Sequence, residues 1–149
     1  MTSNPVLPAD DLPWIALDFL SDIARMRPIA EEILLRCRHA GFTDRDLFAI
    51  RLALEEALMN AVTHGNQQNP AKLVKVLYRI LPDRVDISVE DEGPGFNPAQ
   101  LPDSRAPENL TNAHGRGVHL IQVYMHPVTY NPKGNKITMT RLKNAPNPH

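Results

Sequence analysis

The pattern of apolar and polar positions predicts one long amphipathic helix between Thr43 and Gly65. At about 100° per residue, six apolar residues fall within one wide sector: Leu47, Ile50, Leu54, Ala57, Leu58 and Ala61. A second apolar stripe on roughly the opposite side is formed by Phe48, Leu52 and Met59. A helix that is apolar on two sides is buried on more than one side. We therefore expect this helix to lie at the centre of the domain.

Both ends of this helix carry sequence signals. Thr43 and Asp46 have the spacing of a capping box, in which each side chain accepts a hydrogen bond from the backbone of the other. Gly65 is the residue type that adopts the left-handed conformation after a helix without steric cost. Neither proline nor glycine interrupts the segment between them. The helix is thus predicted to begin after Thr43 and to end at Gly65.

Two apolar segments come before this helix. Trp14 to Leu20 predicts a short strand, and the next segment predicts a helix that Ser21 caps and that runs to about His39. Pro28 falls inside that helix, where it either kinks the helix or marks its true first turn. The pattern does not decide between these two interpretations.

Later segments predict two β-hairpins and one further helix. Loose alternation over 72–81 and clean alternation over 84–90 surround a Pro-Asp turn, as in a hairpin. A second hairpin is predicted by residues 128–130 and 137–142, and a helix by residues 115–125. Because hairpins join most of the strands, we expect a largely antiparallel sheet with the helices on one face. That arrangement is a two-layer α/β sandwich.

Composition and charge narrow the class of protein. The 149 residues predict one domain over 14–142, with flexible segments at 1–13 and 143–149. The net charge of −1 gives no reason to expect nucleic acid or an anionic membrane as a partner. The single cysteine, Cys37, excludes an intramolecular disulfide and fits a reducing cytoplasm, and its apolar position favours a buried structural thiol. No segment predicts a signal peptide or a membrane span.

Glu56 and Asn60 stand out on the long helix. They are four residues apart, so they lie on one face about one turn apart, at the edge of the main apolar sector. His64 follows one turn later. One interpretation is an ordinary polar margin of an amphipathic helix. The other is that the carboxylate and the amide meet a ligand, because burying them without partners is unfavourable.

The segment after the first hairpin favours a ligand. Asp91 ends a strand and is followed by Gly93 and Gly95. An ionised carboxylate is an acceptor only, so Asp91 suits the exocyclic amine of adenine and disfavours guanine, which offers a carbonyl there. The two glycines would let the backbone approach a base or sugar closely. Alone, however, a Gly-x-Gly segment usually marks only a turn.

A third segment completes a site for a nucleoside triphosphate with magnesium. Gly115 to Gly117 would aim free N–H groups of a helix N-terminus at phosphate oxygens, and Arg116 would add a charged contact. Mg²⁺ prefers oxygen ligands and keeps several waters, so Asn60 together with phosphate oxygens can hold it. Glu56 could then accept a proton from an incoming hydroxyl group.

These residues carry a family resemblance. The segments EEALMNAVTHG, DEGPGF and GRGVHLI resemble the N, G1 and G2 boxes of the GHKL (Bergerat-fold) ATPases. Within that superfamily, the span from about Trp14 to Leu142 is similar to the anti-sigma-factor serine kinases of the RsbW and SpoIIAB type. The resemblance implies an α/β sandwich with a mixed sheet, and Mg·ATP bound under a lid between Phe96 and Gly115. His119 departs from the family, which usually has an aromatic or aliphatic residue there.

The resemblance also implies roles and partners. By motif position, Asn60 would hold magnesium and Glu56 would be the catalytic base of an ATP-dependent serine/threonine kinase, a cytoplasmic transferase. The nucleotide contacts would be Asn60, Asp91, Gly93, Gly95, Gly115, Arg116 and Gly117. Members phosphorylate a serine of an anti-anti-sigma (STAS-domain) partner, bind a sigma factor in transcription regulation, and are commonly homodimers.

Two other functions stay open at this stage. One is an ATP-binding module of the same fold that sequesters a sigma factor or another regulator without phosphorylating anything. The other is a plain ATPase that releases phosphate slowly without a protein partner. The motifs do not separate these functions, because the residues that bind nucleotide and those that perform the chemistry overlap.

Overall fold

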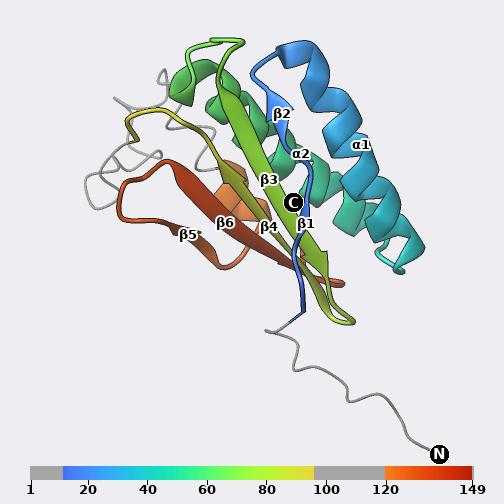
Figure 1. The fold of residues 1–149 in the computed structure, drawn as a ribbon. Helices are drawn as coiled ribbons and strands as arrows, with labels where there is room; N and C mark the ends of the chain where they lie inside the picture. Colours follow the sequence, from blue (N-terminus) through green and yellow to red (C-terminus); the bar gives the residue numbers. More distant parts are fainter. Residues whose placement is uncertain (1–11, 96–119, 149) are drawn as a thin grey trace, which may run out of the picture.

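The computed structural model describes residues 12–95 and 120–148. Figure 1 shows the helices and strands, which follow one another in this order: β1 (Ile15–Ala16), β2 (Phe19–Leu20), α1 (Ile23–His39), α2 (Asp44–Asn60), η2 (Ala61–Gly65), β3 (Leu73–Ile80), β4 (Arg84–Glu90), β5 (Val128–Tyr130) and β6 (Lys136–Leu142). Residues 120–124 form a further short helical segment, which is the described part of the helix predicted over 115–125.

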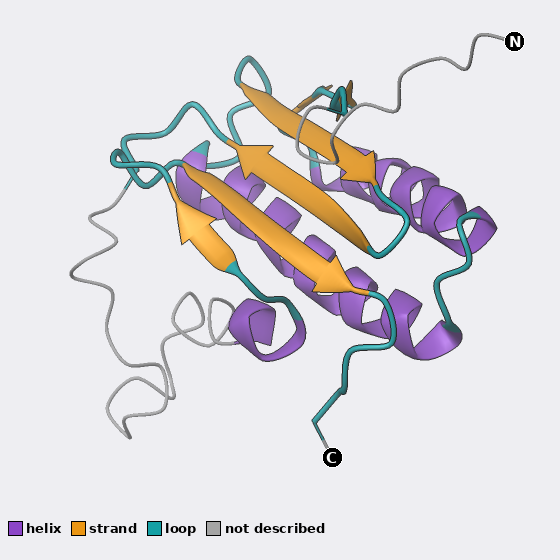
Figure 2. Ribbon diagram, turned by 90° about the horizontal axis from the view of Figure 1, so that it is seen from below, coloured by secondary structure: helices purple, strands orange, loops and turns teal. Residues whose placement is uncertain are grey.

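The strands form one antiparallel sheet in the order β1-β3-β4-β6-β5, and β2 also pairs with β3. Every pairing between the described strands is antiparallel, including both predicted hairpins, β3–β4 and β5–β6. Figure 2 shows the two long helices behind the sheet, on one face. The predicted two-layer α/β sandwich is therefore confirmed.

The predicted start of α2 is confirmed. Asp46 N–H donates to Thr43 Oγ1 at 3.2 Å, and Thr43 N–H donates to Asp46 Oδ2 at 3.4 Å, so both halves of the capping box are present. The main apolar sector faces the core, and all six of its members are buried: Leu47, Ile50, Leu54, Ala57, Leu58 and Ala61.

The second apolar stripe of α2 is not buried, so that prediction is wrong. Phe48 and Met59 are 54% and 37% exposed, and Leu52 is only half-buried. The sheet and α1 cover the main sector, whereas Phe48 makes one edge-on ring contact, with Tyr124. The helix is central to the fold but lacks cover on its far side among the described residues.

The helical run ends at Gly65 as predicted, but not for the predicted reason. Gly65 does not adopt the left-handed conformation, which among the described glycines is found at Gly41, Gly95 and Gly134. The chain continues past Asn60 into the π-helical turn η2, which includes Gly65. Glycine is required there because a side chain would collide with the carboxylate of Asp91, and not because of its backbone angle.

The N-terminal elements are shorter than predicted. The strand expected over 14–20 consists of two short pieces, β1 and β2, both paired with β3. Asp22, not Ser21, caps α1, since its Oδ1 accepts the N–H of Ala24 at 2.9 Å. The helix begins at Ile23, so Pro28 lies inside it and not at its first turn.

The sheet face opposite the helices carries polar side chains in its centre. Asp86 accepts a hydrogen bond from the Thr140 hydroxyl at 2.7 Å and pairs with Arg79 at 2.9 Å. Burial alone would raise the pKa of Asp86, but the Thr140 hydroxyl and the guanidinium groups of Arg79 and Arg84 outweigh it and hold the pKa below 3.8. Ser88, by contrast, is 3% exposed and its hydroxyl has no partner among the described residues.

We expect Ser88→Ala to leave the free energy of unfolding within about 1 kcal/mol of wild type or to raise it, because an unpartnered buried hydroxyl stabilises nothing. Thr140→Val is the matched control on the same sheet face. It should lower the free energy of unfolding by about 1.5–3 kcal/mol, because it removes a hydrogen bond to a charged carboxylate. Urea unfolding of the three proteins measures both values. Equal losses in the two variants would mean that Ser88 has a partner.

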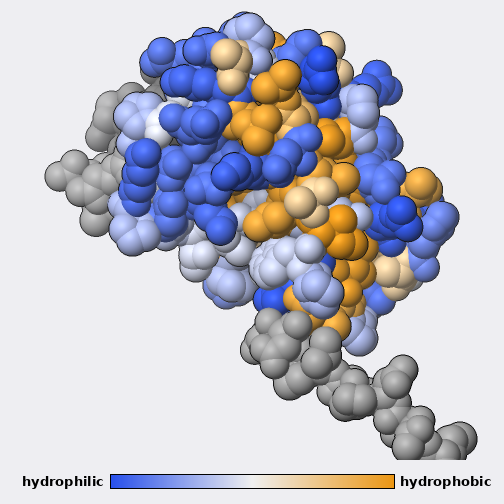
Figure 3. Space-filling view, viewed as in Figure 1, coloured by the Kyte–Doolittle hydropathy of each residue, from blue (hydrophilic) through white to orange (hydrophobic). Residues whose placement is uncertain are grey.

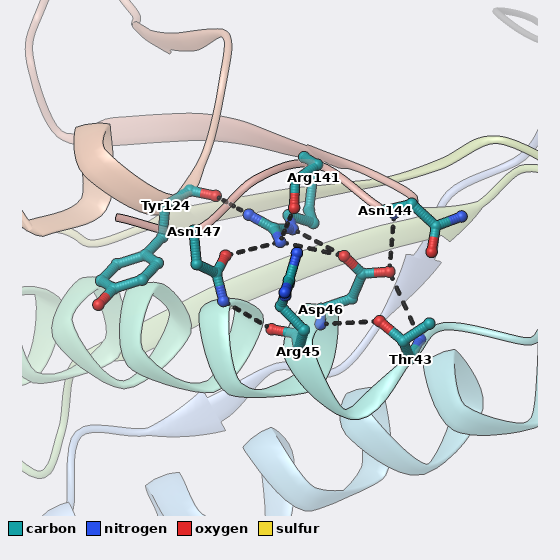
Figure 4. A network of polar contacts seen from close by, with 8 residues as sticks. Thr43, Arg45, Asp46, Tyr124, Arg141, Asn144 and Asn147 are labelled. Atoms are coloured by element: carbon teal, nitrogen blue, oxygen red, sulfur yellow. Dashed lines mark hydrogen bonds and ion pairs between the residues drawn. The ribbon is translucent and has the colours of Figure 1, made fainter. Parts of the chain in front are cut away.

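A buried ion pair joins the start of α2 to β6. The Arg141 guanidinium donates to Asp46 Oδ1 at 3.0 Å, and these side chains are 1% and 0% exposed. Arg141 also donates to the carbonyl oxygens of Tyr124 and Ala145 and to Asn147 Oδ1, as Figure 4 shows in part. This network holds the residues after β6, predicted as a flexible segment, against the first turn of α2.

Apolar side chains remain exposed along the edge formed by β1, β2 and the start of α1. Ile15, Leu20 and Ile23 are 50%, 41% and 46% exposed. Figure 3 shows hydrophobic surface over β1 and β2.

Cys37 lies on the inner side of α1, where burial raises the pKa of its thiol to about 12, as expected for a structural cysteine. Among the described residues, no helix combines the length and apolar character needed to cross a bilayer.

Candidate functional site

A cavity of about 410 Å³ lies where the C-terminal end of α2, the loop after β4 and the turn between β5 and β6 meet. This volume falls in the usual range for small-molecule sites. Its walls come from segments far apart in the sequence: Ala57, Asn60, Ala61, His64, Gly65, Val89, Asp91, Pro94, Gly95, Ile121, Tyr130, Gly134, Asn135, Lys136 and Ile137.

The end of α2 supplies an amide beside small residues. Asn60 is the last residue of α2, and the N–H of Asn66 then donates to the carbonyl oxygen of Ala61 at 2.8 Å. This bond spans five residues and widens the turn η2, a feature that is frequent at functional sites. Ala57 and Ala61 line the cavity and leave room beside the amide of Asn60.

Glycines let the end of η2 touch the loop after β4. A Cβ atom on Gly65 would collide with the carboxylate of Asp91, and one on Gly93 would collide with the carbonyl oxygen of Gly65. Gly95 has a φ of +76°, which glycine adopts without strain, and a Cβ atom there would collide with the carbonyl oxygen of Lys133. Any side chain at these three positions would push the loop away from its neighbours.

Asp91 directly follows β4 and lines the cavity. Its Oδ1 accepts the backbone N–H of Gly93 at 2.8 Å, which sets the direction of the carboxylate relative to the loop. Burial raises the pKa of Asp91 above 3.8, although the Gly93 N–H acts in the opposite direction. A partly desolvated carboxylate of this kind gains from a ligand that donates a hydrogen bond.

The raised pKa predicts that Asp91→Asn stabilises the ligand-free protein at neutral pH. The folded protein keeps the Asp91 proton to a higher pH than the unfolded chain, so wild-type stability falls as the pH rises from 3.8 to the raised value. Asparagine does not ionise, yet its oxygen can still accept the Gly93 N–H. We expect a higher Tm for the variant above this pH window and equal Tm values below it. A lower Tm of the variant at neutral pH would contradict the raised pKa of Asp91.

Asn66 is a buried residue that sequence reasoning missed. Its amide donates to Ser21 Oγ at 2.6 Å and to the Leu73 carbonyl oxygen at 2.9 Å, and its Oδ1 accepts the N–H of Glu92 at 2.8 Å. It thus ties the end of η2 to the start of α1, to β3 and to the loop after β4. An asparagine after a glycine usually marks an exposed turn, so the sequence carried no signal for this role.

Asn131 and Asn135, in the turn between β5 and β6, were missed as well. The Asp91 N–H donates to the Asn135 carbonyl oxygen at 2.9 Å, and Asn135 Nδ2 donates to the Asp91 carbonyl oxygen at 2.8 Å. Asn131 Nδ2 donates to Asn135 Oδ1 at 2.8 Å, and Asn131 Oδ1 accepts N–H groups of the turn, including that of Gly134. The sequence predicted this turn but gave it no role at the site.

The predicted site residues separate into three groups. Asn60, Asp91 and Gly95 line the same cavity. Gly93 is buried against Gly65 and does not line it, and Glu56, one turn before Asn60, is half-buried and not among the lining residues. The predicted contacts of the third segment lie outside the described residues: Gly115, Arg116 and Gly117. The predicted lid between Phe96 and Gly115 and the departure at His119 also lie outside the described residues.

The lining residues fit a purine nucleotide with magnesium. Val89, Ile121 and Ile137 are buried and offer apolar surface for a planar ring. No group of three His, Cys, Asp or Glu side chains among the described residues could hold a metal ion by itself. Mg²⁺ bound by one amide oxygen, phosphate oxygens and water needs no such group. His64, one turn after Asn60, also lines the cavity.

The fold and the cavity together define a two-layer α/β domain with a cavity of ligand size between its central helix and its loops. The model of one protein family, described as the histidine kinase-like ATPase domain, matches residues 19–141. The chain belongs to this family.

Individual relatives agree with this assignment. The chain is 31% identical over 110 residues to the serine-protein kinases RsbW of Staphylococcus aureus strains bovine RF122 / ET3-1 and MRSA252, a match that covers 68% of this chain and 69% of theirs. The fold is similar to the crystal structure of the RsbU and RsbW domains of Rv1364c from Mycobacterium tuberculosis, with a TM-score of 0.57 and 18% identity. That match covers 91% of this chain and spans 34% of the solved one.

Proposed function

We propose that the protein binds Mg·ATP in this cavity, phosphorylates a serine of an anti-anti-sigma (STAS-domain) partner and sequesters a sigma factor. The observation that carries the proposal is that Asn60 and Asp91, 31 positions apart in the sequence, line one cavity of ligand size. The 31% identity to proteins named serine-protein kinase RsbW supports the same reaction class. A homodimer is part of the proposal and rests on the resemblance alone.

In this proposal the lining residues meet different parts of the nucleotide. The Asp91 carboxylate accepts the exocyclic amine of adenine, while Val89 and Ile137 pack against the ring. Asn60 contributes its side-chain oxygen to Mg²⁺, which neutralises charge on the phosphates when it is bound. The small residue Ala57 leaves the phosphates room next to Asn60.

Glu56 acts as the base in the proposed reaction. The serine Oγ of the partner forms a bond to the γ-phosphorus, the bond from that phosphorus to the bridging oxygen breaks, and ADP leaves. The serine proton passes to the Glu56 carboxylate. Glu56 lies one helical turn before Asn60 on the same helix face, next to the residue proposed to hold the metal ion.

One observation favours a second candidate, an ATP-binding module that sequesters a regulator without phosphorylating it. Glu56 is absent from the residues that line the cavity. Such a module would bind ATP with unchanged affinity in Glu56→Ala and would show no phosphoryl transfer even as wild type.

A phosphoryl-transfer assay tests the proposal. Wild-type protein is incubated with Mg·ATP labelled in the γ-phosphate and with an anti-anti-sigma protein encoded in the same genome, and phosphoserine is measured together with ATP affinity by calorimetry. Phosphoserine that depends on both Mg²⁺ and the partner supports the kinase. ATP binding without phosphoserine supports the module, and phosphate release without a partner supports a plain ATPase. No binding of ATP would overturn all three.

A further inference from the structure

The backbone around Asp91 is held from two sides by asparagines. The Asn135 carbonyl oxygen accepts the Asp91 N–H at 2.9 Å, and Asn135 Nδ2 donates to the Asp91 carbonyl oxygen at 2.8 Å. Asn66 Oδ1 accepts the next N–H along the chain, that of Glu92, at 2.8 Å. Three consecutive backbone polar groups at the edge of the cavity are therefore bound by residues from distant parts of the chain.

We propose that Asn135 is a positioning residue for recognition of the nucleobase. By binding the N–H and the carbonyl oxygen of Asp91, it holds the Asp91 carboxylate where it can accept the exocyclic amine of adenine. The inference rests on the proposed function, and it adds to the site a residue that none of the three sequence motifs contains.

The position of a carboxylate this close to its own backbone depends directly on that backbone. An aspartate side chain has two rotatable bonds, and the contact from Gly93 N–H to Asp91 Oδ1 restricts both. A hydrogen bond weakens steeply once its angle falls below about 120°, and donor–acceptor distances beyond about 3.2 Å lie outside the usual range. A small shift of the loop would therefore weaken the bond to adenine even with Asp91 present.

Asn135 is itself held in the required orientation. Asn131 Nδ2 donates to Asn135 Oδ1 at 2.8 Å, so Asn135 Nδ2 is the end of the amide that turns toward Asp91. Gly95, in the same loop, packs closely against the carbonyl oxygen of Lys133. The turn between β5 and β6 thus packs directly against the loop after β4, and Asn135 is the side chain that joins them at Asp91.

The test compares two nucleotides that differ only in the amine. ATP and purine ribonucleoside triphosphate, which lacks the 6-amino group, are titrated with Mg²⁺ into wild-type protein and into Asn135→Ala. We expect Asn135→Ala to weaken ATP binding by about tenfold and to change the affinity for the analogue by less than about twofold, because only ATP uses the Asp91 carboxylate. The preference of wild type for ATP should therefore largely disappear.

A purely structural role, or a direct contact between Asn135 and the sugar or phosphates, would weaken both nucleotides by the same factor. That result would overturn the inference, as would an unchanged ATP preference in Asn135→Ala. If wild type itself does not prefer ATP over the analogue, Asp91 does not recognise the exocyclic amine of adenine. That part of the proposed function is then wrong, and the inference is wrong with it. The proposed function and the inference are thus tested by separate comparisons.

Three further variants secure the interpretation. Asn135→Asp has the same shape and keeps the acceptor for Asn131 but cannot donate to Asp91, so it should lose the ATP preference without losing the fold. Asn147→Ala removes a partly exposed asparagine that also makes side-chain hydrogen bonds, remote from the cavity, and should keep the preference. In an Asp91→Ala background, Asn135→Ala should have no further effect on the ratio of the two affinities.

Discussion

Replacing Glu56 by glutamine should lower the rate of phosphoryl transfer to a partner serine by about 10²- to 10⁴-fold, the usual contribution of a general base. Glutamine keeps the length of the side chain and its hydrogen-bonding capacity but cannot take up the serine proton. Because Glu56 is not among the residues that line the cavity, the affinity for Mg·ATP should stay within about threefold of wild type. Single-turnover phosphorylation and calorimetry measure the two quantities separately.

Glu55→Gln is the matched control for this prediction. Glu55 is the neighbouring residue on α2, but its side chain is 49% exposed and pairs with Arg51 on the surface. It should transfer phosphate at the wild-type rate. If Glu56→Gln transferred phosphate as fast as Glu55→Gln, Glu56 would not be the base. If Glu56→Gln lost ATP affinity and rate by the same factor, its role would be in binding.

The local part of the fold could be predicted from the sequence because its causes are local. The capping box of Thr43 and Asp46, the alternation in β3 and β4 and the turn at Pro82 each depend on residues within a few positions of one another. The same holds for the β5–β6 hairpin. These elements were found with boundaries close to those of the structure.

The wrong predictions about α2 share a physical cause. The apolar stripe of Phe48, Leu52 and Met59 has the spacing of a buried face, yet burial depends on what the rest of the chain brings against it. Gly65 has the identity of a helix-ending residue, but the close approach of Asp91 is what requires glycine there. Contacts between distant segments decided both cases, and periodicity does not contain them.

In the candidate site, too, local motifs could be predicted from the sequence, whereas contacts between distant segments could not. Asn60, Asp91 and Gly95 belong to recognisable motifs, and the fold brings them to one cavity. Asn66 and Asn135 act on the loop after β4 from 26 and 44 positions away, through hydrogen bonds to its backbone. A hydrogen bond to a backbone group does not depend on which side chain the partner residue carries. Residues that position a loop through its backbone therefore cannot be recognised from a motif in a single sequence.

Arg141→Met should lower the free energy of unfolding by about 3–5 kcal/mol, because it leaves the Asp46 carboxylate buried without its cation. Arg141 and Asp46 are 1% and 0% exposed, and Arg141 also binds the carbonyl oxygens of Tyr124 and Ala145. The loss is a large share of the total stability of a domain this size, which is about 5–15 kcal/mol. Urea unfolding at neutral pH measures it. Ile121 lies in the same short helical segment as Tyr124 and lines the cavity, so the variant should also weaken nucleotide binding.

Arg51→Met is the control that shows whether the loss of stability depends on the burial of the ion pair. Arg51 pairs with Glu31 at 2.6 Å, but both side chains are more than 40% exposed, so its loss should cost less than about 1 kcal/mol. Adding Asp46→Asn to Arg141→Met removes the stranded charge and keeps an oxygen for the N–H groups of Thr43 and Asn144. The double variant should therefore be more stable than Arg141→Met alone. Equal losses in Arg141→Met and Arg51→Met, or no recovery in the double variant, would mean that the network stabilises the fold through packing and not through the ion pair.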